Sequence, residues 1–256
     1  MAYKVCIIRA PGTNCDRETA LCIGSLGIEA EVVHVKRIMD GQTHFSDFDG
    51  LIIPGGFSFG DHVRAGALLG KILKERFGDE LVQFSADGKP ILGICNGFQV
   101  LVECGLLPGR GALGALTTNL SSHFECRWVD LKVEESDCIF TRGLRRGIRL
   151  PVAHGEGRFL VTEGELQEMT EANQLVFRYA LEKGEAAGGS YPENPNGSVE
   201  DIAGICNKAG NVFGLMPHPE RAFYSFMHPR WTKSDDADSW GDGYKIFKNM
   251  AEYIRR

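Results

Sequence analysis

The sequence predicts an α/β protein whose core is an open, mostly parallel, doubly wound sheet flanked by helices, with a β-rich later section. Short apolar runs of strand type alternate with helical segments over the first 105 residues, as in a parallel sheet built from strand–helix units. The later part reads as strands and turns. The chain has 256 residues, of which 43% are hydrophobic, enough for the core of one domain spanning 1–256.

In the first half of the chain, segments with a strand-like apolar pattern alternate with segments that have the apolar spacing of a helix. Strands are predicted where β-branched and apolar residues cluster, and helices where apolar residues recur every three or four positions and a glycine such as Gly27 follows. The predicted strands are 4–10, 29–35, 50–53 and 90–94, and the predicted helices are 16–26, 61–77, 78–86 and 98–104.

The second half is richer in strands. Residues 124–133 and 147–161 are β-like, and residues 163–174 are polar and helical in pattern. A turn-rich loop at 184–198 precedes two apolar runs that predict a hairpin, IAGICN and NVFGLM. A polar loop with tryptophans at 228–243 leads into an amphipathic helix at 243–254.

Composition excludes several functions. The net charge of −6 argues against a nucleic-acid partner. No apolar run approaches the roughly 20 residues that span a bilayer, and the N-terminal run is too short for a signal peptide. The eight cysteines contain no C-x-x-C pair. We therefore expect reduced thiols, a cytoplasmic protein, no membrane association and no metal site.

The most informative segment surrounds Cys95. An apolar strand, Ile91–Ile94, runs into Cys95, and a helical segment follows from Phe98. A thiol at a sharp strand-to-helix turn, with Gly93 and Gly97 on either side, is the cysteine form of a nucleophile elbow. Helix N-termini favour the reactive thiolate. The alternative is an ordinary buried cysteine at the end of a strand.

A base and its orienting carboxylate follow the last predicted strand, in the sequence Met216-Pro217-His218-Pro219-Glu220-Arg221. A thiol nucleophile needs a base that takes and returns its proton, and that base needs a carboxylate that holds it. His218 and Glu220 fit these roles together with Cys95. A histidine between two prolines is otherwise often a simple turn residue.

Two glycines, Gly55 and Gly56, follow the strand at 50–53 and can turn backbone N–H groups toward a bound oxyanion. The alternative is a tight turn. The same segment holds a G-x-S-x-G pattern around Ser58, a second candidate elbow. Cys95 is preferred because a well-formed helix follows it directly. The roles of two further residues are undecided. Cys15 could be a second reactive thiol, although a helix cap by Asp16 is the favoured interpretation of that segment. His154 lies in a turn with glycines on either side and is either functional or a solvated turn residue.

Taken together, GICNGFQ, PGGFSFGD and MPHPER resemble the class I (triad-type) glutamine amidotransferases. The segments RAPGTNCD, AHGEGRF and NPNGS…VEDIAGICN narrow the resemblance to the glutaminase subunits of phosphoribosylformylglycinamidine synthase. The motifs run in order from residue 9 to residue 221.

The resemblance implies roles for particular residues. Cys95 would attack the glutamine side chain and form a γ-glutamyl thioester, with His218 carrying protons and Glu220 orienting it. The oxyanion would be held at Gly55, Gly56 and Asn96. The glutamine pocket would include the following residues: Gln99, Asn119, Ser121 and Phe124.

The resemblance also implies partners. Ammonia would pass to a synthetase subunit that binds ATP and magnesium and converts formylglycinamide ribonucleotide to formylglycinamidine ribonucleotide, with a small accessory subunit besides. This chain would need no cofactor. Residues 163–183 and 228–243 make it longer than we expect for such a subunit. The alternatives are amidotransfer to another acceptor, a non-catalytic scaffold on the same fold, and a Ser58 hydrolase.

Overall fold

The computed structural model of the protein describes residues 3–109, 111–144, 147–233 and 240–256. Its strands are β1 (Lys4–Arg9), β2 (Glu29–His34), β3 (Gly50–Ile53), β4 (Ile91–Ile94), β5 (Gly114–Thr117), β6 (Glu125–Val133), β7 (Ile148–His154), β8 (Arg158–Val161), β9 (Leu175–Ala180), β10 (Ile202–Cys206) and β11 (Val212–Leu215). Its α-helices are α1 (Asp16–Ser25), α2 (Val35–Met39), α3 (Ala67–Ala86), α4 (Asn96–Glu103), α5 (Glu163–Glu171) and α6 (Tyr244–Ile254).

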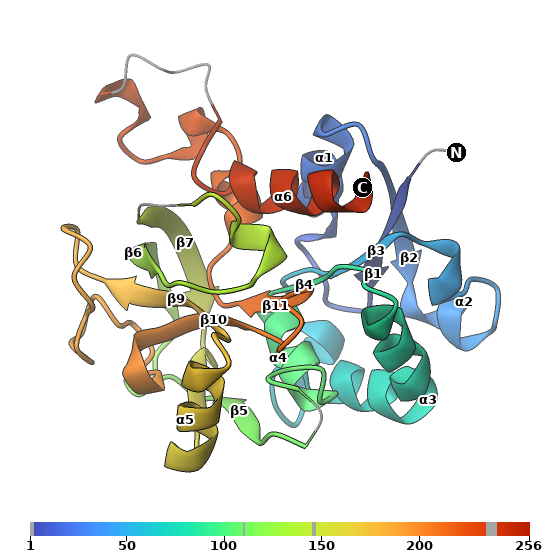
Figure 1. The fold of residues 1–256 in the computed structure, drawn as a ribbon, viewed down its shortest axis with the longest axis horizontal. Coiled ribbons are helices and arrows are strands. Elements are labelled where there is room, and N and C mark those ends of the chain that lie inside the picture. Colours follow the sequence, from blue (N-terminus) through green and yellow to red (C-terminus); the bar gives the residue numbers. More distant parts are fainter. Residues whose placement is uncertain (1–2, 110, 145–146, 234–239) are drawn as a thin grey trace.

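Within the described ranges, one nine-stranded sheet has the order β2-β1-β3-β4-β11-β10-β9-β6-β7, and β5 pairs with β8 separately. The five strands from β2 to β11 are parallel, and the remaining pairings are antiparallel. Helices α1 and α6 lie on one side of the sheet, and α3 and α4 on the other (Figure 1). The predicted α/β class and β-rich later section are confirmed, with parallel pairing confined to one half of a mixed sheet.

The central parallel strands are apolar along their whole length because helices cover both faces. Every residue of β3 and of β4 is buried. The last helix, α6, places Ile246, Phe247 and Met250 in the core, as its amphipathic pattern predicts.

The carboxyl ends of four parallel strands meet at one edge of the sheet. Leu215 lies beside Ile94, and Ile53 beside Gly93, in the paired register. The segments that follow β1, β3, β4 and β11 therefore converge there, which is where ligands bind in open α/β sheets. This topology collects the residues singled out in the sequence.

One long helix, α3, replaces the two helices predicted at 61–77 and 78–86: the predicted end at residue 86 is confirmed, whereas the predicted start at 61 and the break after 77 are wrong. The glycine at position 78 suggests a break, yet a glycine in a long helix costs only about 1 kcal/mol relative to alanine. The helix starts later because Asp61, Val63 and Gly66 have φ values of 52°, 77° and 74°, which a right-handed helix excludes.

Three elements are absent from the sequence prediction. The five-residue α2 is too short for periodicity to reveal, and β5 lies in a stretch with many glycines. β9 lies within residues 163–183 and pairs with both β6 and β10 inside the sheet. That segment is therefore part of the core architecture. The stretch at 147–161, predicted as β-like, forms two strands, β7 and β8, separated by the turn at Gly155.

No helix in the described part of the chain has the length and apolar character needed to cross a membrane. Of the predicted loop at 228–243, residues 234–239 lie outside the described residues.

Candidate active site

Cys95 occupies a strained turn between β4 and α4. Its φ is +51°, a value that non-glycine residues rarely adopt and that recurs where a site constrains the backbone. A Cβ on Gly97 would lie 1.8 Å from the Ile53 carbonyl oxygen, so only glycine lets α4 start this close to β3. The predicted strand, turn and helix are confirmed. The Cys95 thiol faces the Ala153 carbonyl oxygen of β7 at 3.7 Å.

His218 follows β11 and is held at both its backbone and its ring. Its N–H donates to the Pro151 carbonyl at 2.8 Å, and Nδ1 lies 2.5 Å from Glu220 Oε1. Because an ionised carboxylate only accepts, Nδ1 carries the proton in this contact. Among the described residues, Nε2 has no hydrogen-bond partner. The nitrogen that can act as a base is therefore Nε2.

The charge of His218 is set by two opposing effects. Burial lowers the pKa of the imidazole, but the negative charges of Glu220 and then Cys95 outweigh it and hold the pKa well above the usual value. Glu220 is fully buried and hydrogen-bonds the ring, so it stabilises the imidazolium. The arrangement favours a protonated histidine beside Cys95, as acid–base transfer to a leaving amine requires.

The glycine turn after β3 packs directly against His218. A Cβ on Gly55 would lie 2.7 Å from the His218 ring carbon Cε1. Gly56 has a φ of +145° and pairs with Thr13 in an antiparallel bridge. The hydrogen bonds of that bridge run from Asn14 N–H to the Gly55 carbonyl and from Phe57 N–H to the Gly12 carbonyl. In such a pair the N–H of Gly56 points away from the bridge, which leaves it for another acceptor.

The Asn96 side chain ties the elbow to the loop after the glycine turn. Its amide donates to Gln99 Oε1 at 2.9 Å and to Asp61 Oδ1 at 3.3 Å, and its oxygen accepts from the Ser58 N–H. Burial, and next the negative charge of Glu156, raise the pKa of Asp61 to about 6. The Asp61 carboxyl beside the elbow therefore titrates closer to neutral pH than an ordinary aspartate does.

The residues predicted to bind glutamine lie around this edge of the sheet, in different environments. The side chains of Gln99 and Asn119 are buried: Gln99 donates to the Glu156 carbonyl, and Asn119 donates to the carbonyls of His123 and His154. Ser121 is exposed and donates to Glu125. Phe124 is half-exposed and stacks on Phe57, with ring centroids 6.4 Å apart. Contact of these residues with glutamine stays a prediction.

His154 is buried near these groups, and its Nδ1 lies 3.0 Å from Asn119 Oδ1. Burial, and then the positive charge of His218, lower the pKa of His154 to about 3. His154 is therefore neutral at physiological pH and does not form an ion pair with a thiolate.

Ser58, the second candidate elbow, lacks a base. Its hydroxyl is buried and has no hydrogen-bond partner among the described residues. A serine hydrolase needs a histidine at that hydroxyl, so the arrangement does not support a Ser58 hydrolase.

The structure also brings in a residue that the sequence left open. Cys15, fully buried at the start of α1, places its Sγ 4.0 Å from His218 Nδ1. The two residues are 203 positions apart, so no local spacing indicates the contact. The favoured cap by Asp16 is wrong: Cys15 is the N-cap residue, no side chain caps the helix, and Asp16 is paired with Arg9 at 3.5 Å.

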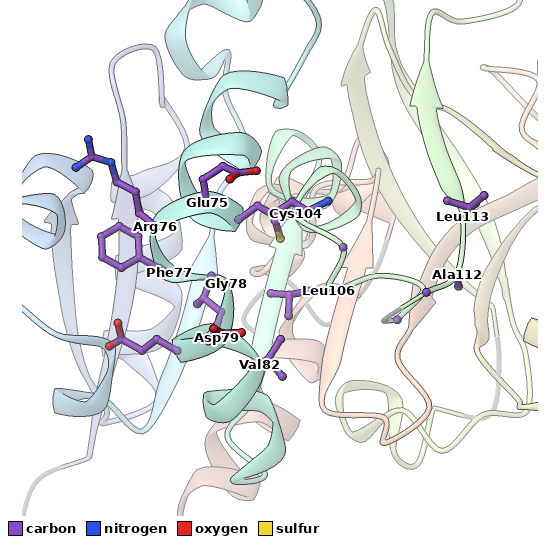
Figure 2. Close-up of a pocket in the computed structure, with 16 residues that line it drawn as sticks. Glu75, Arg76, Phe77, Gly78, Asp79, Val82, Cys104, Leu106, Ala112 and Leu113 are labelled. Atoms are coloured by element: carbon purple, nitrogen blue, oxygen red, sulfur yellow. The ribbon is translucent and has the colours of Figure 1, made fainter.

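A cavity of about 490 Å³ lies elsewhere, between α3 and the segment after α4 (Figure 2). Its lining includes Glu75 and Asp79 of α3 and, just past the carboxyl end of α4, Cys104 and Leu106. Cys95 precedes the amino end of the same helix. The cavity therefore does not belong to the cluster around Cys95.

Gly55→Ala is expected to lower the turnover number of the glutaminase reaction that the resemblance implies by between about ten- and a hundredfold, because the added methyl group displaces the His218 ring. Gly78→Ala is the matched control: nothing lies within 4 Å of its added Cβ, in the middle of α3. It should keep full activity and gain up to about 1 kcal/mol in unfolding free energy. Steady-state kinetics and thermal unfolding of both variants check this, and equal turnover in the two would contradict the packing argument.

The fold and the arrangement of the site residues together define the class of protein. A cysteine elbow, a histidine–glutamate pair after the adjacent strand and a glycine turn against the histidine form the constellation of triad-type amidotransferases on an α/β sheet. The model of the CobB/CobQ-like glutamine amidotransferase domain family matches residues 2–254.

Similar proteins of known name identify the group within this family to which the chain belongs. The protein called phosphoribosylformylglycinamidine synthase subunit PurQ in Archaeoglobus fulgidus is 44% identical over 99% of this chain and 97% of its own length. That of Methanosarcina acetivorans is 45% identical, with 98% of each chain covered. The chain therefore belongs to the glutamine amidotransferase family, in the group of these PurQ subunits.

Solved structures agree. A chain in the structure of PurLQS from Thermotoga maritima is 36% identical, with a TM-score of 0.76, and the match covers 99% of this chain and 100% of that one. A glutamine amidotransferase of Thermotoga maritima, at 14% identity and a TM-score of 0.54, shares the fold over 91% of this chain and 82% of its own. Since relatives match along nearly their whole length, the expectation that residues 163–183 and 228–243 lengthen this chain beyond its family is wrong.

Proposed function

We propose that the chain is the glutaminase subunit of phosphoribosylformylglycinamidine synthase. It hydrolyses glutamine and delivers ammonia to a synthetase partner that converts formylglycinamide ribonucleotide to formylglycinamidine ribonucleotide in purine biosynthesis. The observation that carries the chemistry is the strained Cys95 elbow beside the His218–Glu220 pair. The choice of pathway rests on the PurQ relatives.

The first half of the reaction forms a thioester. The Cys95 thiolate attacks the side-chain carbonyl carbon of glutamine, and a carbon–sulfur bond forms as the carbonyl oxygen becomes an oxyanion. The His218 imidazolium gives its Nε2 proton to the amide nitrogen. The carbon–nitrogen bond then breaks, and ammonia leaves with the γ-glutamyl group still bound to Cys95.

The second half restores the enzyme. His218, now neutral, takes a proton from water at Nε2, and the resulting hydroxide attacks the thioester carbon. The carbon–sulfur bond breaks, glutamate leaves, and the thiolate–imidazolium pair is regenerated. Glu220 accepts the Nδ1–H bond throughout and so keeps Nε2 directed at the reacting atoms.

Backbone N–H groups would stabilise the oxyanion. We assign this role to Gly56 and Asn96, with Gly55 shaping the turn. The orientation of the Gly56 N–H away from its bridge and the position of Asn96 at the first turn of α4 support the assignment.

Partners supply the rest of the synthesis. The Thermotoga maritima relative is part of a structure called PurLQS, which supports a synthetase subunit and a small accessory subunit as partners of this chain. ATP and magnesium are assigned to the synthetase. All eight cysteines are free thiols, which supports a reducing, cytoplasmic setting.

We expect the free subunit to hydrolyse glutamine poorly and the synthetase to stimulate it. The loop after the glycine turn is strained, with positive φ values at Phe59, Asp61 and Val63, and Val63 is 90% exposed. Such a loop can hold the Gly56 N–H out of place until a partner covers it, and a displacement of about 1 Å costs roughly a hundredfold in rate.

Steady-state glutaminase assays with and without the synthetase, ATP and formylglycinamide ribonucleotide test the coupling. Full activity in the isolated chain, unchanged by the partner, would refute it and favour an independent glutaminase. Glutaminase activity with no formylglycinamidine ribonucleotide formed in the complex would instead indicate another acceptor.

A further inference from the structure

A second thiol lies beside the proposed triad. Cys15 Sγ, His218 Nδ1 and a carboxylate oxygen of Glu220 lie within 4.8 Å of one another, and all three residues are buried. The nucleophilic mechanism uses Cys95 and the Nε2 side of the ring. Cys15, on the Nδ1 side, has no part in it.

Cys15 is held rigidly in this place. Its N–H donates to the Gly55 carbonyl at 3.2 Å, and its own carbonyl accepts a hydrogen bond from the Thr19 hydroxyl at 2.6 Å. The thiol donates to Asn14 Oδ1 at 3.1 Å. These bonds hold the backbone of Cys15 in place, and the thiol's bond to Asn14 favours the rotamer in which the sulfur faces His218.

We propose that Cys15, His218 and Glu220 form an inhibitory binding site for a thiophilic divalent cation of the zinc type. Thiolate sulfur, imidazole nitrogen and carboxylate oxygen are the donors that zinc uses in proteins. Around a tetrahedral zinc ion, sulfur and nitrogen donors lie about 3.6 Å apart. The Sγ–Nδ1 distance of 4.0 Å is close to this value, whereas Nδ1 and Glu220 Oε1, which are 2.5 Å apart, would separate by about 1 Å as the metal ion replaces the proton between them. Water completes the coordination.

The charge of the site also fits a cation. Glu220 brings one negative charge, and Cys15 brings a second once a metal ion displaces its thiol proton. The guanidinium of Arg221 faces both groups: Nη2 donates to Cys15 Sγ at 3.1 Å, and Nε lies 3.9 Å from Glu220 Oε1. Arg221 is 39% exposed and also faces Glu18 of α1 at 4.0 Å. Outward movement toward Glu18 would open the way for a metal ion and remove the competing charge.

Metal binding would stop hydrolysis through the tautomer of His218. In the working site Nδ1 carries the ring proton and Nε2 is the base. A cation on Nδ1 displaces that proton, and the neutral ring then carries its proton on Nε2. The Cys15 thiol releases its own proton to solvent. His218 can no longer accept a proton from Cys95, and Glu220 no longer orients the ring.

Cobalt binding to the full chain tests the site without any assay of activity. Co²⁺ should produce a thiolate-to-cobalt charge-transfer band in wild type and in Cys95→Ser, and the band should be lost in Cys15→Ser. A band that survives in Cys15→Ser and disappears in Cys95→Ser would place the metal on the nucleophile and overturn the proposal. Absence of the band in wild type would overturn it as well.

Inhibition by zinc tests the consequence and rests on the proposed function. In the assembled synthase, Zn²⁺ should inhibit glutamine-dependent synthesis, and a chelator should reverse it. For each protein we compare the zinc concentration that halves its own metal-free rate. Compared with wild type, this concentration should rise at least about tenfold in Cys15→Ala and should fall in Arg221→Gln. Equal zinc sensitivity in all three proteins would refute the inhibitory role.

The two experiments fail in different ways. If the proposed function were wrong, the cobalt band and its dependence on Cys15 would remain while glutaminase activity was missing. If Cys15→Ser did not fold, as thermal unfolding would reveal, Arg221→Gln would still decide the matter, because the loss of the competing guanidinium should strengthen the cobalt band at a fixed metal concentration. No strengthening there would count against the site.

Discussion

Cys95→Ser is expected to lower glutamine hydrolysis by about 10⁴-fold or more, since loss of a nucleophile in a triad removes nearly all of its rate acceleration. Cys15, the other thiol in contact with His218, faces Nδ1, the nitrogen that is bonded to Glu220, so it cannot take over the role of Cys95. A serine at the elbow is a far weaker nucleophile because its hydroxyl stays protonated. Glutaminase kinetics of the assembled synthase measure the loss.

Two controls make the result specific. Cys126→Ser changes an exposed thiol and should leave both activity and unfolding temperature unchanged. Synthesis from added ammonia should survive in the Cys95→Ser complex, because that chemistry belongs to the partner. Glutaminase activity within about tenfold of wild type would show that Cys95 is not the nucleophile. Loss of the ammonia-dependent reaction would indicate a damaged complex instead.

His218→Ala should lower glutaminase activity nearly as much as Cys95→Ser does. Glu220→Gln should lower that activity about ten- to a hundredfold less than His218→Ala. The base moves the protons, whereas the carboxylate orients and stabilises it. Glu220→Gln keeps the shape of the side chain but removes the charge that raises the pKa of His218. The pH–rate profile of that variant should accordingly move the histidine limb to lower pH, a shift that a purely structural defect does not produce.

His44→Ala is the matched control for histidine removal. His44 is exposed, and its bond to Asp47 uses the backbone N–H, which alanine keeps, so the substitution should leave both stability and turnover nearly unchanged. Activity in His218→Ala equal to wild type would rule out this base, and His154 would be tested next. The low pKa of His154 and its bond to Asn119 argue against that outcome.

The elbow is the part of the site that local sequence reveals best. Its strand, turn and helix are consecutive in the chain, and the glycines at 93 and 97 mark the close approach that the turn requires. His218 and Glu220 are two residues apart and form their contact within one turn. Both features involve residues that are close together in the chain, so the sequence alone predicts them.

Other structural features depend on contacts with residues that are distant in the sequence, which a local sequence pattern does not reveal. α3 begins at Ala67 because the backbone at Asp61 and Val63 is left-handed, in a loop whose Asp61 side chain is bonded to Asn96 of the elbow. β9 becomes an interior strand only because β6 and β10 pair with it. Gln99 and Asn119, predicted from resemblance as glutamine contacts, have side-chain amides that bond to carbonyls of the segment around β7 and β8.

By itself, the sequence determined the α/β class, the cysteine at a strand-to-helix turn, the histidine–glutamate pair and the family resemblance. Each depends on residues close together in the chain or on motifs in a set order. Only the tertiary structure decided that two thiols lie near His218. The parallel register that aligns β1, β3, β4 and β11 brings Cys15 to Nδ1 and brings Cys95 close enough to raise the pKa of the imidazole. Such proximity arises from strand pairing across the whole sheet, and no spacing in the sequence encodes it.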